Sequence, residues 1–276
     1  MKKNIRLLVL WVGTKCTLRC KNCCNLIPYL EQKSYDVDDI ISNLNYITKD
    51  MNIELLQIQG GEPFTHKYIA DIIEKCAINT HVHKIDIASN GTIFPNERTI
   101  SVIKKYADKI SIRFSKYDCV EKLRNDIEKK MNEVYGIDVC EYDFVNETGE
   151  WFDLGEICQK KETNKELISQ TYKICPNKSC WTLAENYFAG CGRMVSYLKL
   201  KHNESIEKSN VLDLLKLREE NKNFIEVFQL FEDNYNRYAS ELCGYCKIGE
   251  KPIPAAIQIS ADELHELMRK GRGDEI

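Results

Sequence analysis

The apolar stretch at residues 6–13, Arg-Leu-Leu-Val-Leu-Trp-Val-Gly, leads directly into a loop with three cysteines, Cys16, Cys20 and Cys23. Its near-continuous apolar character is typical of a strand that is buried on both faces of a sheet. Four more candidate strands follow, at residues 53–59, 84–89, 109–114 and 137–140. Amphipathic stretches with helical spacing separate them, near residues 37–51, 67–78, 96–107 and 118–135.

Strands that alternate with helices at this spacing predict repeated βα units around a parallel sheet. Right-handed crossovers allow either an open doubly wound sheet or a barrel, and periodicity alone does not choose between them. The pattern changes near residue 145, after about five units, whereas a closed barrel has about eight. We therefore predict an α/β core over residues 1–145 that is incomplete if it is a barrel.

Residues 146–276 follow another pattern. Two short strands, 181–183 and 187–189, flank Ala184-Glu185-Asn186 and predict a hairpin. Residues 205–231 are charged and leucine-rich, which favours one or two surface helices, and residues 260–270 begin with a capping pattern that favours a terminal helix.

The composition is that of an ordinary soluble globular protein, with 43% hydrophobic and 29% charged residues among 276. Lys and Arg number 39 against 42 Asp and Glu, so the net charge is −3. This balance argues against nucleic acid and anionic membranes as partners. No apolar run reaches the ~18 residues that a membrane-spanning helix needs.

The 13 cysteines are the unusual feature of the composition. Their number is odd, and a chain of this size does not need disulfides for stability. Metal or cluster ligation in a reducing, cytoplasmic compartment is the better interpretation. We expect Cys24, Cys76, Cys119, Cys140 and Cys158 to be packing thiols instead.

One disulfide could use only two of the three cysteines Cys16, Cys20 and Cys23. All three are close enough in sequence to point at one centre. Structural zinc sites usually have four protein ligands. Three cysteines with no fourth ligand nearby suit a [4Fe–4S] cluster with one open iron, although fully protein-ligated clusters have four.

The C-x3-C-x2-C spacing of these cysteines after the first strand resembles that of the radical S-adenosylmethionine (radical SAM) superfamily. The resemblance implies that the open iron binds the amino and carboxylate groups of S-adenosylmethionine. Reductive cleavage of this cofactor then gives a 5′-deoxyadenosyl radical. Asn22 stands where the family usually has an aromatic residue.

Three more motifs extend the resemblance to residue 115, and each follows a predicted strand. Gly60, Gly61, Glu62 and Pro63 resemble the family's GGE motif, whose backbone meets the methionyl ammonium group. Ser89 and Asn90 would contact the ribose. Arg113 or Ser115 would hold the methionyl carboxylate, although Arg113 is alternatively a solvated charge at a strand end.

The C-terminal cysteines resemble those of the SPASM/twitch subset, which carries an auxiliary cluster domain. The resemblance implies a partial (β/α) TIM-like barrel of about five to six units followed by a small cysteine-rich domain. One auxiliary [4Fe–4S] cluster would use Cys191, Cys243, Cys246 and either Cys175 or Cys180. Zinc is the alternative for this site.

The resemblance leaves three functions open. The first is hydrogen abstraction from a small hydroxylated metabolite, such as a sugar or aminocyclitol, leading to oxidation or epimerisation. The second is radical modification of a peptide or protein side chain. The third is a non-catalytic iron–sulfur electron-transfer protein. Both enzymatic functions imply a reductant such as flavodoxin or ferredoxin as a partner.

Overall fold

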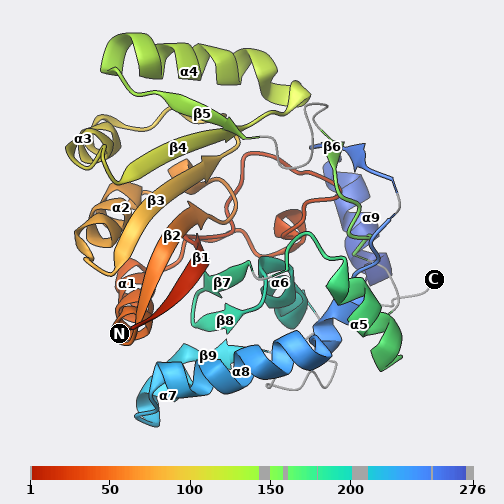
Figure 1. Ribbon diagram of the computed structural model, residues 1–276. Coiled ribbons are helices and arrows are strands. Elements are labelled where there is room, and N and C mark those ends of the chain that lie inside the picture. The colour runs from red at the N-terminus through yellow and green to blue at the C-terminus, as the bar shows by residue number, and fades with distance from the viewer. Residues whose placement is uncertain are drawn as a thin grey trace.

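The computed structural model describes residues 2–142, 150–157, 161–178, 180–200, 211–249 and 251–271 (Figure 1). Five parallel strands from the first half of the chain lie side by side in the order β5-β4-β3-β2-β1. Each was expected from its apolar run, with bounds that differ by a few residues. They are β1 (Lys3–Trp11), β2 (Met51–Gln59), β3 (Val82–Ser89), β4 (Ile110–Ser115) and β5 (Val139–Tyr142).

Four helices connect these strands, and α1–α3 cover one face of the sheet (Figure 1). Their starts follow from capping chemistry: the Asp36 side chain accepts hydrogen bonds from the amides of Asp38 and Asp39, and Asn96 accepts one from Thr99. The helices are α1 (Val37–Thr48), α2 (Ile69–Ile78), α3 (Glu97–Lys105) and α4 (Glu121–Tyr135).

The predicted hairpin joins the same sheet on the other side of β1. β7 (Trp181–Ala184) runs parallel to β1, with Leu8 opposite Trp181 and Trp11 opposite Ala184. β8 (Tyr187–Ala189) and β9 (Leu212–Asp213) continue the sheet in antiparallel fashion. The described sheet thus has six parallel strands, from β5 to β7, which confirms the α/β class and the incomplete, TIM-like barrel. The division at residue 145 remains a prediction, and the sheet crosses it.

Aromatic side chains hold the C-terminal helices against this hairpin. Trp181 stacks on Phe188 with ring centroids 5.6 Å apart, and Phe228 meets both rings edge to face. Phe228 belongs to α8 (Phe224–Tyr238), whose buried side also includes Phe231. The expectation of surface helices within residues 205–231 is therefore wrong for α8, because the aromatic face of this helix is part of the core. Residues 201–210 lie outside the described residues. The other helices here are α5 (Lys165–Lys173), α6 (Gly192–Leu200) and α7 (Leu214–Glu219).

The C-terminal segment returns to the barrel. β10 (Ile253–Pro254) pairs with β6 (Glu150–Trp151), and the amide of Lys21 donates to the carbonyl of Ile257. The terminal helix α9 (Ala261–Gly271) begins at Ser260, which exchanges hydrogen bonds with Glu263 as the capping pattern predicted. Short 3-10 helices within the described ranges complete the connections: η1 (Ile27–Tyr29), η2 (Pro63–Thr65), η3 (Asp118–Val120) and η5 (Glu241–Tyr245). None of the described helices is long and apolar enough to cross a membrane.

Candidate active site

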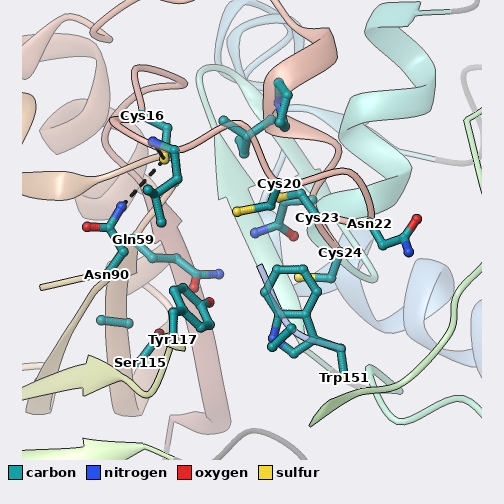
Figure 2. A pocket seen from close by; sticks show the side chains of 18 of the residues that line it. Cys16, Cys20, Asn22, Cys23, Cys24, Gln59, Asn90, Ser115, Tyr117 and Trp151 are labelled. Carbon is teal, nitrogen blue, oxygen red and sulfur yellow. Dashed lines mark hydrogen bonds between the residues drawn. The ribbon is translucent and has the colours of Figure 1, made fainter. Parts of the chain in front are cut away.

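A cavity lies where the loops that follow β1, β2, β3 and β4 meet (Figure 2). Ligands of parallel α/β proteins bind at the carboxyl ends of the strands, so the location is the expected one. Eight of the eleven residues predicted for the S-adenosylmethionine site line the cavity: Cys16, Cys20, Cys23, Gly60, Gly61, Ser89, Asn90 and Ser115. Asn22, which replaces the usual aromatic residue, lines it as well.

The three cysteines of the first loop are close enough to influence one another. Burial raises the pKa of the Cys20 thiol, and the neighbouring Cys23 and Cys16 raise it further. Burial also raises the pKa of Cys16, to about 12, with Cys23 adding to the effect. Thiolates in such a place need an electron-poor partner, because burial and like charge both oppose ionisation. The donor set therefore fits an iron–sulfur cluster.

No group of three or more Cys, His, Asp or Glu side chains in the described ranges is placed to hold a single metal ion. A single zinc ion would hold every thiolate sulfur at ~2.3 Å. The ligands of a four-iron cluster bind separate irons, so they need not converge on one point.

The glycines of the second motif allow two backbones to approach closely. A Cβ on Gly61 would lie 2.0 Å from the Lys15 carbonyl oxygen, and one on Gly60, whose φ is +141°, would lie 2.2 Å from that of Gly13. The amides of Gly61 and Glu62 donate to the carbonyls of Gly13 and Lys15, at 3.0 and 2.8 Å. The motif thus fixes the cysteine loop. Its contact with the methionyl ammonium group stays a prediction.

Glu62 connects the second motif to the third. Its carboxylate is 1% exposed and accepts hydrogen bonds from the Ser89 hydroxyl at 2.9 Å, the Asn90 amide at 2.8 Å and the Phe64 amide at 3.1 Å. Burial raises its pKa to about 7 in spite of these donors. Glu62 and Pro63 are not among the residues that line the cavity, and their contact with the cofactor stays a prediction.

Asn90 connects the third motif back to the cysteine loop. Its side-chain amide donates to the Thr17 hydroxyl at 3.0 Å and to the Cys16 sulfur at 3.7 Å, the contact drawn in Figure 2. Glu62, Asn90 and Cys16 come from three separate loops. Together they form one hydrogen-bonded network behind the cavity.

The two candidates for the methionyl carboxylate differ in the structure. Arg113 forms a bidentate ion pair with the buried Asp86, with Nε to Oδ1 at 2.8 Å and a terminal nitrogen to Oδ2 at 2.7 Å. Arg113 is thus paired with a carboxylate of the protein and is not a solvated charge. It is also not among the residues that line the cavity. Ser115 lines the cavity, so it is the better placed of the two.

The C-terminal cysteines come together from separate segments. Burial raises the pKa of Cys191 well above its usual range, and its strongest electrostatic neighbours are Cys243, Cys246 and Cys175. Cys243 is likewise influenced by Cys246 and Cys175. Cys180 lies within electrostatic reach of Cys24 and Cys175. This geometry favours Cys175 over Cys180 as the fourth member of the group.

Several cavity residues were not anticipated from the sequence. Gln57 and Gln59 line the cavity from the end of β2, and Tyr117 and Trp151 meet edge to face with centroids 5.5 Å apart (Figure 2). Two glutamines at alternate positions in an apolar strand are a usable signal, because side chains two apart share a face. Trp151 follows a turn-rich segment and has no such signal.

The packing thiols also differ from expectation. Cys76 is fully buried, as predicted. Cys119 and Cys140 are exposed, because Cys119 lies in the short helix η3 and Cys140 on the edge strand β5. Cys24 lines the cavity. Cys158 lies outside the described residues.

Residues 12–134 match the family model of the Radical SAM superfamily. This part of the chain is therefore similar to a radical SAM domain, and the motifs that carry the similarity surround the cavity. Similarity in fold extends beyond these residues.

Two curated relatives are GTP 3′,8-cyclases. The one from Desulforamulus reducens is 30% identical over 97 residues, and the one from Thermodesulfovibrio yellowstonii is 32% identical over 97 residues. Each match covers 33% of this chain and 29% of the relative, so the chain spans less than a third of their length. The crystal structure of BtrN in complex with AdoMet and 2-DOIA is similar with a TM-score of 0.55 and 11% identity, over 94% of this chain and 98% of BtrN. This likeness shows a shared fold.

Proposed function

We propose that this chain is a radical SAM enzyme that removes a hydrogen atom from a small hydroxylated metabolite, such as a sugar or aminocyclitol, and oxidises it. The observation that carries the proposal is one cavity in which the cysteine loop, the Gly-Gly turn and Asn90 face a wall of apolar and amide side chains. Bound at Cys16, Cys20 and Cys23, a [4Fe–4S] cluster supplies the electron that cleaves S-adenosylmethionine to a 5′-deoxyadenosyl radical. A flavodoxin or ferredoxin in the cytoplasm is the expected reductant.

The residues of the chain orient this chemistry. Gly60 and Gly61 hold the cysteine loop against β2, and Asn90 donates to the Cys16 sulfur. Ser89, Asn90 and Ser115 line the cavity from neighbouring strand ends. The Ser115 hydroxyl is suited to the methionyl carboxylate or a ribose hydroxyl, because it can donate and accept hydrogen bonds, whereas Ser89 and Asn90 already donate to Glu62, Thr17 and Cys16 and would shape the site through those contacts.

The remaining wall combines apolar side chains, such as Trp151 and Phe152, with neutral amide groups, which favours an uncharged substrate that carries hydroxyl groups. Apart from the cysteines, the ionisable side chains among the described residues that line the cavity are the acid Glu150, the base Lys116 and the phenol of Tyr117. Amide side chains, which pair with hydroxyls in either direction, are more numerous: Asn22, Asn25, Gln57, Gln59 and Asn177.

Oxidation of a carbinol to a carbonyl removes two electrons and two protons. In the proposal, one electron and one proton leave as the hydrogen atom taken by the 5′-deoxyadenosyl radical. The second proton is released from the hydroxyl group. Cys175, Cys191, Cys243 and Cys246 would hold an auxiliary [4Fe–4S] cluster, which would supply an acceptor for the second electron.

The test is formation of 5′-deoxyadenosine by the reconstituted protein with dithionite and S-adenosylmethionine under anaerobic conditions. We expect Cys16→Ala to abolish the product and Cys76→Ala, a change of a buried cysteine in α2, to retain it. Deuterated sugars and aminocyclitols then identify the substrate, because a true substrate transfers deuterium to 5′-deoxyadenosine. Wild-type product no higher than that of Cys16→Ala would exclude radical chemistry and favour an electron-transfer protein. Deuterium transfer only from a labelled peptide would favour the peptide alternative.

Epimerisation is a second candidate, because one spare thiol faces the cavity. Cys24 lines it, whereas Cys180 does not. The Cys24 thiol would donate a hydrogen atom to the substrate radical, and the thiyl radical would be restored by one electron from the auxiliary cluster and one proton from solvent. An epimerase would incorporate one solvent deuterium per product in D₂O, and Cys24→Ala would abolish this incorporation. An oxidised product without solvent deuterium favours the first candidate.

A further inference from the structure

Arg193 is a buried cation between the two cysteine groups. It is 2% exposed, in the first turn of α6, two residues after Cys191. One terminal nitrogen donates to the carbonyl of Gly155 at 2.6 Å and to the Tyr197 hydroxyl at 3.1 Å. Its Nε is buried and has no hydrogen-bond partner among the described residues.

Arg193 lies on a helix that contacts both groups. The Ser196 hydroxyl of α6 donates to the carbonyl of Asn25, two residues after Cys23, at 2.5 Å, and Cys191 directly precedes the helix. In keeping with this placement, Arg193 opposes the rise that burial causes in the pKa of Cys23, Cys175 and Cys246. The guanidinium therefore lies within electrostatic range of three cysteines that come from three separate segments.

Arg193 also has a structural connection to the second group. The Tyr197 ring stacks on the Tyr245 ring with centroids 4.6 Å apart, and the Tyr197 hydroxyl donates to the Tyr245 carbonyl at 2.9 Å. Tyr245 lies between Cys243 and Cys246 in sequence. Arg193, Tyr197 and the Cys243–Cys246 loop are thus held in one fixed arrangement.

A buried charge is costly unless an opposite charge compensates it. Among the described ion pairs, none joins Arg193 to a carboxylate. A [4Fe–4S] cluster with four thiolate ligands carries a net negative charge, and reduction makes it more negative. The thiolates next to Arg193 are those that would supply this charge.

We infer that Arg193 is the counter-ion shared by the two cysteine groups, and that its charge raises the reduction potential of the auxiliary cluster at Cys175, Cys191, Cys243 and Cys246. The inference rests on the proposed function, since it requires that cluster. A fixed positive charge favours the reduced state, because the reduced cluster carries one more negative charge. Arg193 would therefore make the cluster a better acceptor for the second electron of substrate oxidation. It acts as a positioning and electrostatic residue, without touching the substrate.

The test compares Arg193→Gln with Arg193→Lys in a Cys16→Ala/Cys20→Ala/Cys23→Ala background, in which the auxiliary cluster is the only source of the EPR signal. Gln removes the charge and keeps a hydrogen-bond donor, whereas Lys keeps the charge. We expect Gln to shift the one-electron reduction equilibrium by at least about tenfold toward the oxidised state, about 59 mV lower in potential. Lys should change it by less than about threefold, on the same logarithmic scale.

The outcomes separate this inference from the proposed function. A background protein without iron and without an EPR signal would overturn the proposed auxiliary cluster itself. An intact cluster with the same potential in the Gln variant and in the parent would overturn the role of Arg193 alone. If Gln prevents cluster assembly, the Lys variant decides: an assembled cluster at the parent potential supports the inference, and loss of the cluster in both variants contradicts it.

Discussion

The two cysteine groups are built in different ways. The first lies on one loop of eight residues after β1, and backbone contacts from the Gly-Gly turn and a side-chain contact from Asn90 fix it. The second gathers Cys175, Cys191, Cys243 and Cys246 from the end of α5, the start of α6 and the short helix η5. Aromatic stacking and the buried Arg193 hold these segments together. A local site depends on loop geometry, and a dispersed site depends on the packing of whole elements.

The largest effect should come from the backbone contact that holds the first group. Gly61→Ala places a Cβ 2.0 Å from the Lys15 carbonyl oxygen, so the cysteine loop must move. A displacement of ~1 Å at a catalytic group costs about 10²-fold in rate. We expect a loss of at least that size in 5′-deoxyadenosine formation. Gly136→Ala is the control for backbone strain without a clash, because Gly136 has a φ of +62° and a Cβ there meets nothing within 4 Å. Equal losses in the two variants would contradict the role given to the Gly61 contact.

The second group predicts a sharp difference between two neighbouring cysteines. Cys175→Ala should lose about four irons per chain, the content of one [4Fe–4S] cluster. Cys180→Ala should keep its iron, because Cys180, unlike Cys175, is not among the main electrostatic neighbours of Cys191 and Cys243. Iron and sulfide analysis of the purified variants measures both. Iron loss in Cys180→Ala alone would reverse the assignment, and full iron in both variants would mean that neither is a ligand.

The network behind the cavity should make stability depend on pH. The folded-state pKa of Glu62 is raised from 4.5 to about 7, chiefly by burial. Between these values the folded protein binds more protons than the unfolded chain, so this group makes the protein less stable as the pH rises toward 7. The full difference is on the order of 3 kcal/mol. Urea unfolding of the iron-free protein at pH 5 and pH 7.5 should show this loss, and Glu62→Gln should remove most of it.

The control for that experiment is Glu74→Gln. Glu74 is a surface carboxylate that pairs with Lys105 at 2.7 Å, and that contact lowers its pKa. Its replacement should leave the difference in stability between pH 5 and pH 7.5 nearly as in the wild type. A Glu62→Gln variant with the same pH dependence as the wild type would show that Glu62 titrates normally.

The sequence was most informative where structure is local. Each of β1–β5 follows from an apolar run, and the cysteine spacing, the Gly-Gly turn and Asn90 follow strand ends that meet at one edge of a parallel sheet. The pairing of β7 with β1 could not be predicted, because a four-residue strand carries no information about its distant partner. The choice of Cys175 over Cys180 depends on how α5, α6 and η5 pack. The pairing of Arg113 with Asp86 joins β4 to β3, and the burial of Arg193 is visible only in the folded chain.

The most direct test of the account is a comparison of wild type with the Cys16→Ala/Cys20→Ala/Cys23→Ala variant by iron analysis and EPR, with and without S-adenosylmethionine. We predict about eight irons per chain in the wild type and about four in the variant, two [4Fe–4S] clusters and one. S-adenosylmethionine should change the EPR spectrum of the reduced wild type and leave that of the variant unaltered. A variant that keeps the full iron content, or whose spectrum still responds to S-adenosylmethionine, would contradict the assignment of the first cysteine group as the cluster that binds this cofactor.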